Sequence, residues 1–212
     1  MDHYPANSEI VVLDFETTGL STSEHRIIEV GAAIVERNTI KSTFSSLCNP
    51  GTKIPPFITS LTGITNAMVS SQPTPEEVME EFSCFVGNRP IIAHNASFDG
   101  RFLSAEMARI GKGVANPIAC TMLLSRRLIT DSSDYKLGTL KEYVGFQADD
   151  HHKDHRALDD VKVTVALWNY LLRVLEGTVG HDAITFAEVQ KISRISKYKI
   201  KDFLCQLSQP SV

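Results

Sequence analysis

Two carboxylates stand at the end of the first apolar segment of the chain. Asp14 and Glu16 are two positions apart, so in a β-strand both side chains would lie on the same face. Carboxylates held side by side repel each other and resist burial, and a bound cation resolves that conflict. Hard oxygen ligands at this spacing suit Mg²⁺ or Mn²⁺ rather than zinc. The pair on its own also fits a charged strand end in solvent.

Two more carboxylates stand at the starts of expected helices. Asp99 falls in the first turn of a helix that follows the short apolar segment 90–94, where the helix dipole already favours negative charge. Asp160 lies in the first turns of a longer helix, on the flank of its apolar stripe, whereas Asp159 points away from that stripe. We therefore expect Asp160, and not Asp159, to face a site on the sheet.

A histidine precedes the same long helix. His155 stands five positions before Asp160 and follows the polar stretch 147–154. Its ordinary pKa lies near working pH, so a histidine over a bound metal could take a proton from water. Its neighbours His151 and His152 are expected to be exposed side chains without such a role. Because α/β proteins form their sites at strand and helix ends, the carboxylates and His155 together predict one site.

Three apolar segments at the start of the chain predict the strands that carry this site. Residues 10–15 form a compact apolar run that fits a buried central strand. Residues 27–35 form a second run, and residues 40–47 alternate enough to predict a half-exposed third strand. Short connections without a helical pattern join them, which predicts an antiparallel meander. A loop rich in proline and glycine is then expected at residues 49–73.

Helices alternate with short strands after that loop. Thr74 fits an N-cap, Pro75 the first helical position, and Glu77 the last member of a capping box. The remaining expected elements are short strands at 90–94 and 118–120, a helix ending at Gly111, the segment 122–128, a small helix at 140–144, a long helix at 155–176, and one or two helices within 181–207. This order predicts an α/β fold with a central mixed sheet, antiparallel in its first three strands and then parallel, covered by helices.

Length and charge fit this architecture. The 212 residues, of which 42% are apolar, suit one α/β domain with a short appendage. We expect the domain to span residues 1–176 and a helical C-terminal extension to span residues 177–212. The formal charge of −4 argues against a basic protein that coats nucleic acid. The extension is locally basic through Lys191, Arg194, Lys197, Lys199 and Lys201.

The cysteines and the N-terminus bear on location. The four cysteines are scattered without a C-x-x-C pair, which gives no support for a zinc knuckle or a redox motif and predicts buried, reduced thiols. Residues 1–9 are polar and predict no signal peptide. No apolar run reaches the roughly 20 residues that span a bilayer. A cytoplasmic protein with no membrane contact is therefore expected.

Three ordered motifs resemble those of the DEDDh 3′→5′ exonucleases. They read VVLDFETTGL at 11–20, IAHNASFD at 92–99 and HRALDD at 155–160, and LTGIT at 61–65 lies between the first two. The resemblance covers roughly residues 8–176 and is greatest toward the proofreading epsilon subunit of bacterial replicative DNA polymerase. It implies a ribonuclease H-like fold, and it makes residues 1–176 an exonuclease domain.

The resemblance also implies a role for each residue of the predicted site. Asp14, Glu16 and Asp160 would hold the metal ion that activates water, and Asp14 would bridge to a second ion. Asp99 would complete the site, and His155 would act as the general base. Two Mg²⁺ ions, for which Mn²⁺ would substitute, stabilise the attacking and leaving oxygens of an in-line displacement at phosphorus. The expected products are nucleoside 5′-monophosphates and a chain shortened by one nucleotide.

Other motif positions imply contacts with a single-stranded 3′ end. These expected substrate-binding residues are Thr17, Thr18, Leu20, Ile64, Asn95 and Phe98. The two threonines would offer backbone or hydroxyl groups to the terminal nucleotide, and the two aliphatic side chains would pack against its base. The asparagine and the phenylalanine would line the path of the strand. Apolar packing accepts any base, although Leu20 and Ile64 equally fit ordinary core positions.

The sequence leaves several functions open. A ribonuclease similar to oligoribonuclease or ribonuclease T would use the same chemistry and differ in whether the site accepts a 2′-OH. DNA is favoured over RNA because the motif wording is closest to the epsilon subunit. An inactive module that recruits a polymerase is a second alternative, and an active nuclease that is also a DNA polymerase subunit is a third. The basic extension would bind a partner, guide a nucleic-acid strand or form a solvated helix face.

Overall fold

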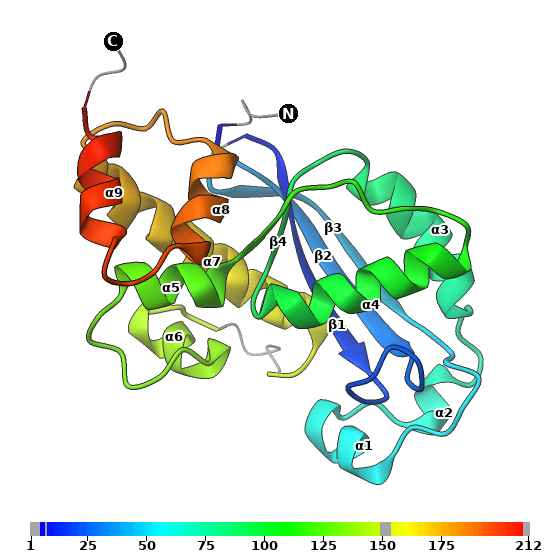
Figure 1. Cartoon of the computed structure of the whole chain (residues 1–212). Coiled ribbons are helices and arrows are strands. Elements are labelled where there is room, and N and C mark those ends of the chain that lie inside the picture. Colours follow the sequence, from blue (N-terminus) through cyan, green and yellow to red (C-terminus); the bar gives the residue numbers. More distant parts are fainter. Residues whose placement is uncertain (1–4, 7, 149–153, 210–212) are drawn as a thin grey trace.

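A five-stranded mixed sheet forms the centre of the computed structural model, which describes residues 5–6, 8–148 and 154–209 (Figure 1). His151 and His152 lie outside these residues. The strand order within the described part is β3-β2-β1-β4-β5. The strands are β1 (Ile10–Thr17), β2 (Ile27–Glu36), β3 (Thr39–Leu47), β4 (Ile91–Ala93) and β5 (Ile118–Cys120).

The pairing of the strands confirms the predicted topology. β1 pairs antiparallel with β2, and β2 pairs antiparallel with β3. β4 pairs parallel with β1, and β5 pairs parallel with β4. β2 is buried along almost its whole length, whereas β3 is an edge strand whose first five residues are exposed. β1 is therefore a central strand. Its C-terminal end lies beside that of β4, because the two strands are parallel neighbours.

Helices cover both faces of the sheet (Figure 1). α3 and α4 lie on one face, and α5 to α9 lie on the other. The bounds are α1 (Pro56–Thr62), α2 (Asn66–Val69), α3 (Pro75–Val86), α4 (Ala96–Arg109), α5 (Thr121–Leu128), α6 (Leu137–Tyr143), α7 (Ala157–Val179), α8 (Phe186–Arg194) and α9 (Ile200–Leu207). The predicted capping box at the start of α3 is confirmed. None of the helices in the described ranges has both the length and the apolar character of a membrane span.

The alternation of side chains along β1 separates the two layers of core. Val11, Leu13 and Phe15 pack with α3 and α4. Ile10 and Val12 pack on the opposite face with α7 and its neighbours. Asp14 and Glu16 share the parity of Ile10 and Val12, so they continue the face that α7 covers. The same alternation that builds the core therefore directs both carboxylates toward one helix.

The expected loop at 49–73 is wrong in part, because α1 and α2 form within it. The prolines and glycines that suggested a loop serve as helix boundaries. Pro56 occupies the first turn of α1, and Gly63 ends it in the left-handed region at φ 72°. Thr65 then caps α2 by accepting a hydrogen bond from the backbone N–H of Met68.

Two of the four cysteines also differ from expectation. Cys48 and Cys120 are buried as predicted, but Cys84 and Cys205 are exposed. All four are free thiols. Cys84 faces solvent because Val78, Phe82 and Val86 take the buried face of α3 at helical spacing.

The C-terminal segment forms two helices, within the predicted range of one or two. Phe186 and Val189 of α8 and Phe203 of α9 join the same apolar cluster as Trp168 of α7. A backbone bridge also connects Thr185 to Pro5 near the start of the chain. The division into residues 1–176 and 177–212 stays a prediction. Its boundary falls within α7, which continues to Val179.

A glycine lets the start of α7 approach the sheet very closely. Gly31 on β2 pairs with Asp14 on β1. A Cβ added to Gly31 would lie 2.3 Å from the carbonyl carbon of Ala157 and 2.4 Å from the nitrogen of Leu158. These are backbone atoms of the first turn of α7, which cannot swing aside as a flexible side chain can.

We expect Gly31→Ala to destabilise the fold by about 3 kcal/mol through overpacking, because α7 would have to move away from β2. Urea-induced unfolding measures this change. Gly177→Ala is the matched control, because it lies in α7 with open space around its Cα and should be neutral or stabilising by about 0.5–1 kcal/mol. Equal stability of the two variants would contradict the close approach.

Candidate active site

One cavity brings together all five residues that the sequence analysis selected for chemistry. It has a volume of about 1110 Å³ and opens where β1 and β4 end and α7 begins. Its lining includes Asp14, Glu16, Asp99, His155 and Asp160. The edge of a sheet at which parallel strands end is the usual place for sites in α/β folds.

Asp99 joins β1 through a backbone hydrogen bond. Its carboxylate Oδ1 accepts from the N–H of Phe15 at 3.2 Å, and its residue is only 3% exposed. Phe15 lies between Asp14 and Glu16, so this bond fixes the first turn of α4 against the strand that carries the other two carboxylates. The dipole at the N-terminus of α4 adds to the stabilisation of the charge on Asp99.

The start of α7 supplies the other side of the site. One ligand atom each from Glu16, His155 and Asp160 lies within 4.8 Å of the others. The backbone N–H of His155 donates to Asp160 Oδ2 at 3.1 Å, and His155 adopts a left-handed conformation at φ 62°. Asp159 pairs instead with Lys162 at 2.8 Å. The structure thus brings Asp160, as expected, to the sheet and leaves Asp159 outside the cavity.

Burial and mutual repulsion raise the pKa values of the site carboxyls. Burial is the largest cause for Asp14, and the charges of Asp99 and Asp160 raise its pKa further, well above the usual value. Burial, followed by the charge of Asp160, raises the pKa of Glu16 to about 8. Burial also raises the pKa of Asp99 to about 7, against the opposing effect of the Phe15 N–H. Ionisation of Asp14, Glu16 and Asp99 together is therefore unfavourable without a nearby positive charge.

The donor set fits a hard divalent cation. The four carboxylates and the imidazole of the predicted site line the cavity together with Glu24, Asp154, His25 and His94, and no cysteine is among its lining residues. Every influence that acts on Asp14 raises its pKa, so a cation would relieve an unfavourable accumulation of negative charge there. Carboxylate oxygens are the ligands that Mg²⁺ and Mn²⁺ prefer in proteins.

The predicted substrate-binding residues divide into two groups. Leu20 is 76% exposed at the mouth of the cavity, and Asn95 and Phe98 line its wall. Thr17 and Thr18 also line it, but both are buried. The Thr17 hydroxyl donates to the carbonyl of Gly19 at 2.7 Å, and the Thr18 hydroxyl accepts from the N–H of Arg26 at 3.1 Å. The threonine hydroxyls therefore shape the loop after β1.

Ile64 does not reach the cavity, which corrects the expectation that it packs against a base. It is 0% exposed and packs with Ile28, Ile54 and Val69, and Ile58 of α1 packs on this cluster. The tight turn at Gly63 directs it inward. Ile64 thus belongs to the buried cluster on which α1 packs through Ile58.

Sequence reasoning missed the apolar rim that α1 forms. Phe57 is 74% exposed, Leu61 is also exposed, and both line the cavity together with Ile58. Ile58 and Leu61 follow Phe57 by one and four positions, which is a helical spacing. The prolines and glycines around this segment nevertheless predicted a loop. Lys136 and Lys141 on the opposite side were missed as well, because single lysines at the start of a short helix and within it carry no distinctive pattern.

His94 of the second motif holds the opposite wall in place. Its Nδ1 lies 2.9 Å from the hydroxyl of Thr121, and its Nε2 lies 3.0 Å from the carbonyl oxygen of Tyr135. Burial lowers the pKa of His94 to about 4, so the ring is neutral at physiological pH. His94 therefore connects the end of β4 to α5 and to the segment before α6.

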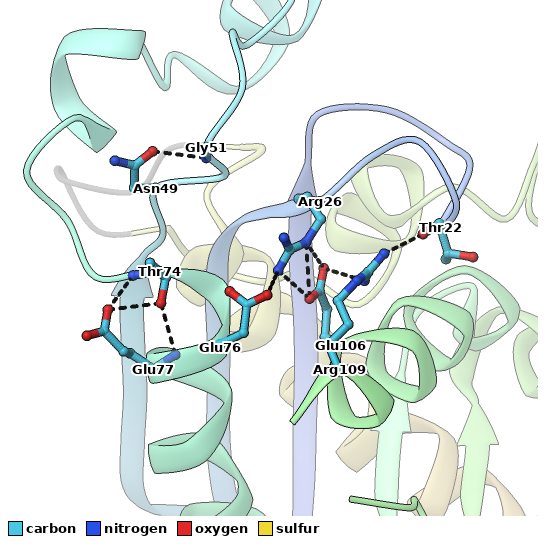
Figure 2. Close-up of polar contacts among 9 residues, drawn as sticks. All are labelled: Thr22, Arg26, Asn49, Gly51, Thr74, Glu76, Glu77, Glu106 and Arg109. Atoms are coloured by element: carbon cyan, nitrogen blue, oxygen red, sulfur yellow. Dashed lines mark hydrogen bonds and ion pairs between the residues drawn. The ribbon is translucent and has the colours of Figure 1, made fainter. Parts of the chain in front are cut away.

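A buried ion-pair network holds the loop between β1 and β2 (Figure 2). Glu106 of α4 is 1% exposed and accepts hydrogen bonds from Arg26 Nε and Nη2, both at 3.0 Å. Arg26 also reaches Glu76 at 2.7 Å, and Arg109 pairs with Glu106 at 3.1 Å. Arg109 then donates to the carbonyl of Thr22 at 2.8 Å. The loop that carries Leu20 is thus attached to α4 at Thr22 and at Arg26.

Comparison with solved structures defines the class of fold. The chain superposes on Exonuclease X in complex with 5′ overhanging duplex DNA with a TM-score of 0.69 and 29% identity, over 87% of this chain and 99% of that one. This similarity and the mixed five-stranded sheet define a ribonuclease H-like exonuclease fold.

Comparison of sequences identifies the family. The profile described as Exonuclease matches residues 11–168. A DNA polymerase III subunit epsilon from Aquifex aeolicus is 37% identical over 78% of this chain and 81% of its own length. A DNA polymerase III of PolC type from Clostridium perfringens is 38% identical over 86% of this chain, which spans only 12% of that polymerase. The chain belongs to the exonuclease family, which confirms the predicted class of enzyme.

The raised carboxyl pKa values predict how stability depends on pH. The pKa of Glu16 is about 8 in the folded chain against an ordinary value of 4.5, so the folded state binds more protons between these values. Stability in EDTA should therefore fall as pH rises from about 4.5 to 8. Mg²⁺ should raise the melting temperature more at pH 8 than at pH 5, because it binds the ionised carboxylates. Circular dichroism melting curves measure both effects.

Glu16→Gln provides the control for this pH dependence. It removes one titrating group from the site, so the fall in melting temperature between pH 5 and pH 8 should be smaller than in the native chain. An unchanged melting temperature across this range in the native chain would show that the carboxyls ionise without cost.

The Glu106 network predicts a separable effect on substrate binding. Glu106→Gln should destabilise the fold by about 3 kcal/mol, since Arg26 and Arg109 would lose the negative charge of their shared buried partner. The loop that carries Leu20 would lose its attachment, so KM for an oligonucleotide should rise about tenfold while kcat changes little. Glu9→Gln, which breaks an exposed pair with Arg89, should change stability by less than about 1 kcal/mol. Equal effects of the two substitutions in urea unfolding and steady-state kinetics would disprove the role of the network.

Proposed function

We propose that the chain is a metal-dependent 3′→5′ exonuclease that hydrolyses phosphodiester bonds from the 3′ end of single-stranded DNA. The observation that carries this proposal is the convergence of three separate sequence motifs on one cavity. Residues 14 and 16, residue 99, and residues 155 and 160 come from β1, α4 and the start of α7, and they line the same space. An inactive binding module would have no need for this convergence.

The carboxylates of the cavity are the proposed metal ligands. Asp14, Glu16 and Asp160 would hold one ion, Asp14 would also reach a second, and Asp99 would complete the set. Mg²⁺ is the proposed ion, with Mn²⁺ as a substitute. The bound ions would supply the positive charge that activates water and stabilises the attacking and leaving oxygens at phosphorus.

His155 is the proposed general base. Its ring lies near Glu16 and Asp160, and its backbone is held by Asp160 Oδ2. The imidazole would take a proton from the attacking water as the new P–O bond forms and the bond from phosphorus to O3′ breaks. The shortened strand leaves with a 3′-OH, and the released nucleotide carries a 5′-phosphate. Because His155 is exposed, its proton can pass directly to solvent.

The rim of the cavity supports binding of an unpaired strand end. Leu20 and Phe57 present large apolar surfaces at its mouth, and Phe98 lies on its wall. Apolar and aromatic surfaces pack against any base, which suits an enzyme that removes successive nucleotides regardless of sequence. Lys136 is exposed at the opposite side, where an ammonium group would attract the phosphate backbone.

DNA is the proposed substrate because of the relatives. The epsilon subunit and the PolC-type protein are both components of DNA polymerase III by name, and Exonuclease X was solved with DNA. Association with a DNA polymerase, and the proofreading that would follow from it, is proposed on the same basis. The predicted cytoplasmic location rests on the sequence alone.

An oligonucleotide assay tests the proposal. Labelled DNA and RNA single strands of one sequence are incubated with the protein in Mg²⁺, Mn²⁺ or EDTA. We expect stepwise shortening of DNA from the 3′ end, release of nucleoside 5′-monophosphates, and no reaction in EDTA. Faster shortening of RNA would assign the same chemistry to a ribonuclease. Absence of hydrolysis of either strand by folded protein would refute the proposed function.

Neighbouring substitutions provide the controls for this assay. His155→Ala should lower kcat by about 10²–10⁴-fold, the usual contribution of a general base. Asp160→Asn should abolish hydrolysis, whereas Asp159→Asn should leave kcat within about twofold of the native value, because Asp159 pairs with Lys162 outside the cavity. Equal loss in both aspartate variants would contradict the assignment of Asp160.

A further inference from the structure

A buried glutamate on β2 contacts the start of α7. Glu29 is 2% exposed. Its Oε1 accepts from Arg156 Nη2 at 2.7 Å and from Nε at 3.1 Å. Its Oε2 accepts from the backbone N–H of Ala157 at 2.9 Å and from Arg156 Nε at 3.1 Å. Both carboxylate oxygens are thus occupied by α7 and the residue before it.

These bonds supply a cap that α7 lacks in its own sequence. Arg156 occupies the N-cap position, and its side chain makes no capping hydrogen bond. By contrast, Thr74 and Thr185 cap α3 and α8 locally. The unpaired N–H groups at a helix N-terminus favour a negatively charged acceptor. Glu29 provides that acceptor from a strand 128 residues away in sequence.

The position of Glu29 is otherwise unfavourable. It lies directly opposite Glu16 in the β1–β2 register, so it adds a further negative charge beside the carboxylate site. A buried carboxylate in such a place is retained only with strong hydrogen bonds and a cationic partner. The planar fork of Arg156 gives it two parallel bonds, which a lysine cannot reproduce.

The two residues that Glu29 contacts, Arg156 and Ala157, lie in the chain between His155 and Asp160. His155 directly precedes Arg156, and Asp160 lies one turn after Ala157. The closeness of the first turn to Gly31 allows Glu29 to reach the helix. A shift of Arg156 or of the Ala157 N–H must therefore move His155 and Asp160 together.

We propose that Glu29 and Arg156 are positioning residues that hold His155 and Asp160 over the carboxylates of β1. The inference rests on the proposed function for its kinetic consequence. Neither residue contacts the reacting atoms in this arrangement. Their effect passes through the first turn of α7, where a displacement of about 1 Å can cost about 100-fold in rate.

The test compares Glu29→Gln, Arg156→Met and Arg156→Lys with the native chain. We expect the first two to lower kcat on a DNA single strand about 100-fold, while KM changes by less than about twofold. Mn²⁺ affinity, measured by isothermal titration calorimetry without nucleic acid, should fall about tenfold, as for other residues that orient metal ligands. Arg156→Lys, which keeps the charge, should restore part of both losses. The double variant Glu29→Gln/Arg156→Met should be no worse than the poorer single variant, because both remove one anchor.

Glu106→Gln is the matched control for Mn²⁺ affinity alone, since Glu106 is equally buried and also paired with arginine; it should keep that affinity near the native value. Glu9→Gln, which removes a carboxylate paired with Arg89 away from the cavity, should keep both Mn²⁺ affinity and kcat near the native values. A folded Glu29→Gln protein that keeps both values would overturn the proposal, and so would a loss of melting temperature alone. If the native chain hydrolyses no strand, the proposed function fails. The Mn²⁺ titration still decides the positioning role in that case, because native binding lost in Glu29→Gln supports it and equal binding rejects it.

Discussion

The concentration of like charge at the end of β1 is the constraint on which the site depends. Asp14 and Glu16 leave the strand on one face, and Asp99 and Asp160 are brought to them by α4 and α7. Burial and the neighbouring carboxylates disfavour the ionised forms of Asp14 and Glu16, and burial also disfavours that of Asp99. In the absence of a cation, a rigid frame must hold such groups together, because repulsion would otherwise separate them. The hydrogen bond from Phe15 to Asp99 and the anchor of α7 on β2 provide that frame.

Two ion-pair networks, each built around one buried glutamate, attach different parts of the site to the fold. Glu29 and Arg156 attach α7 to β2 beside the carboxylates. Glu106, Arg26 and Arg109 attach the loop after β1 to α4 at the mouth of the cavity. One network therefore fixes the start of α7, which carries Asp160, and the other fixes the loop that carries Leu20. The two do not share a residue, so the loop after β1 can change without disturbing the charged centre.

Sequence patterns predicted most of the regular elements, and the residues that they selected for chemistry lie in one cavity. The apolar run of β1, the capping box of α3 and the stripe of α7 follow from local periodicity, and three motifs identified the carboxylates and His155. The rim of α1 was missed because its bounding proline and glycine resemble loop residues. Ile64 was misplaced because burial after a tight turn depends on tertiary packing. The contact between Glu29 and Arg156 could not be predicted from the sequence. Glu29 lies inside an apolar run, and the two residues are 127 positions apart.

That long separation has a consequence for the order in which the molecule forms. β1 and β2 are neighbours in sequence and pair with each other, but the first turn of α7, which contacts Glu29 of β2, follows that residue by 128 positions. Contacts of such high sequence separation form late, after local structure has collapsed. A chain still being synthesised therefore carries Asp14, Glu16 and Asp99 without His155 or Asp160. The five residues proposed for catalysis therefore come together only once the first turn of α7 has docked on β2.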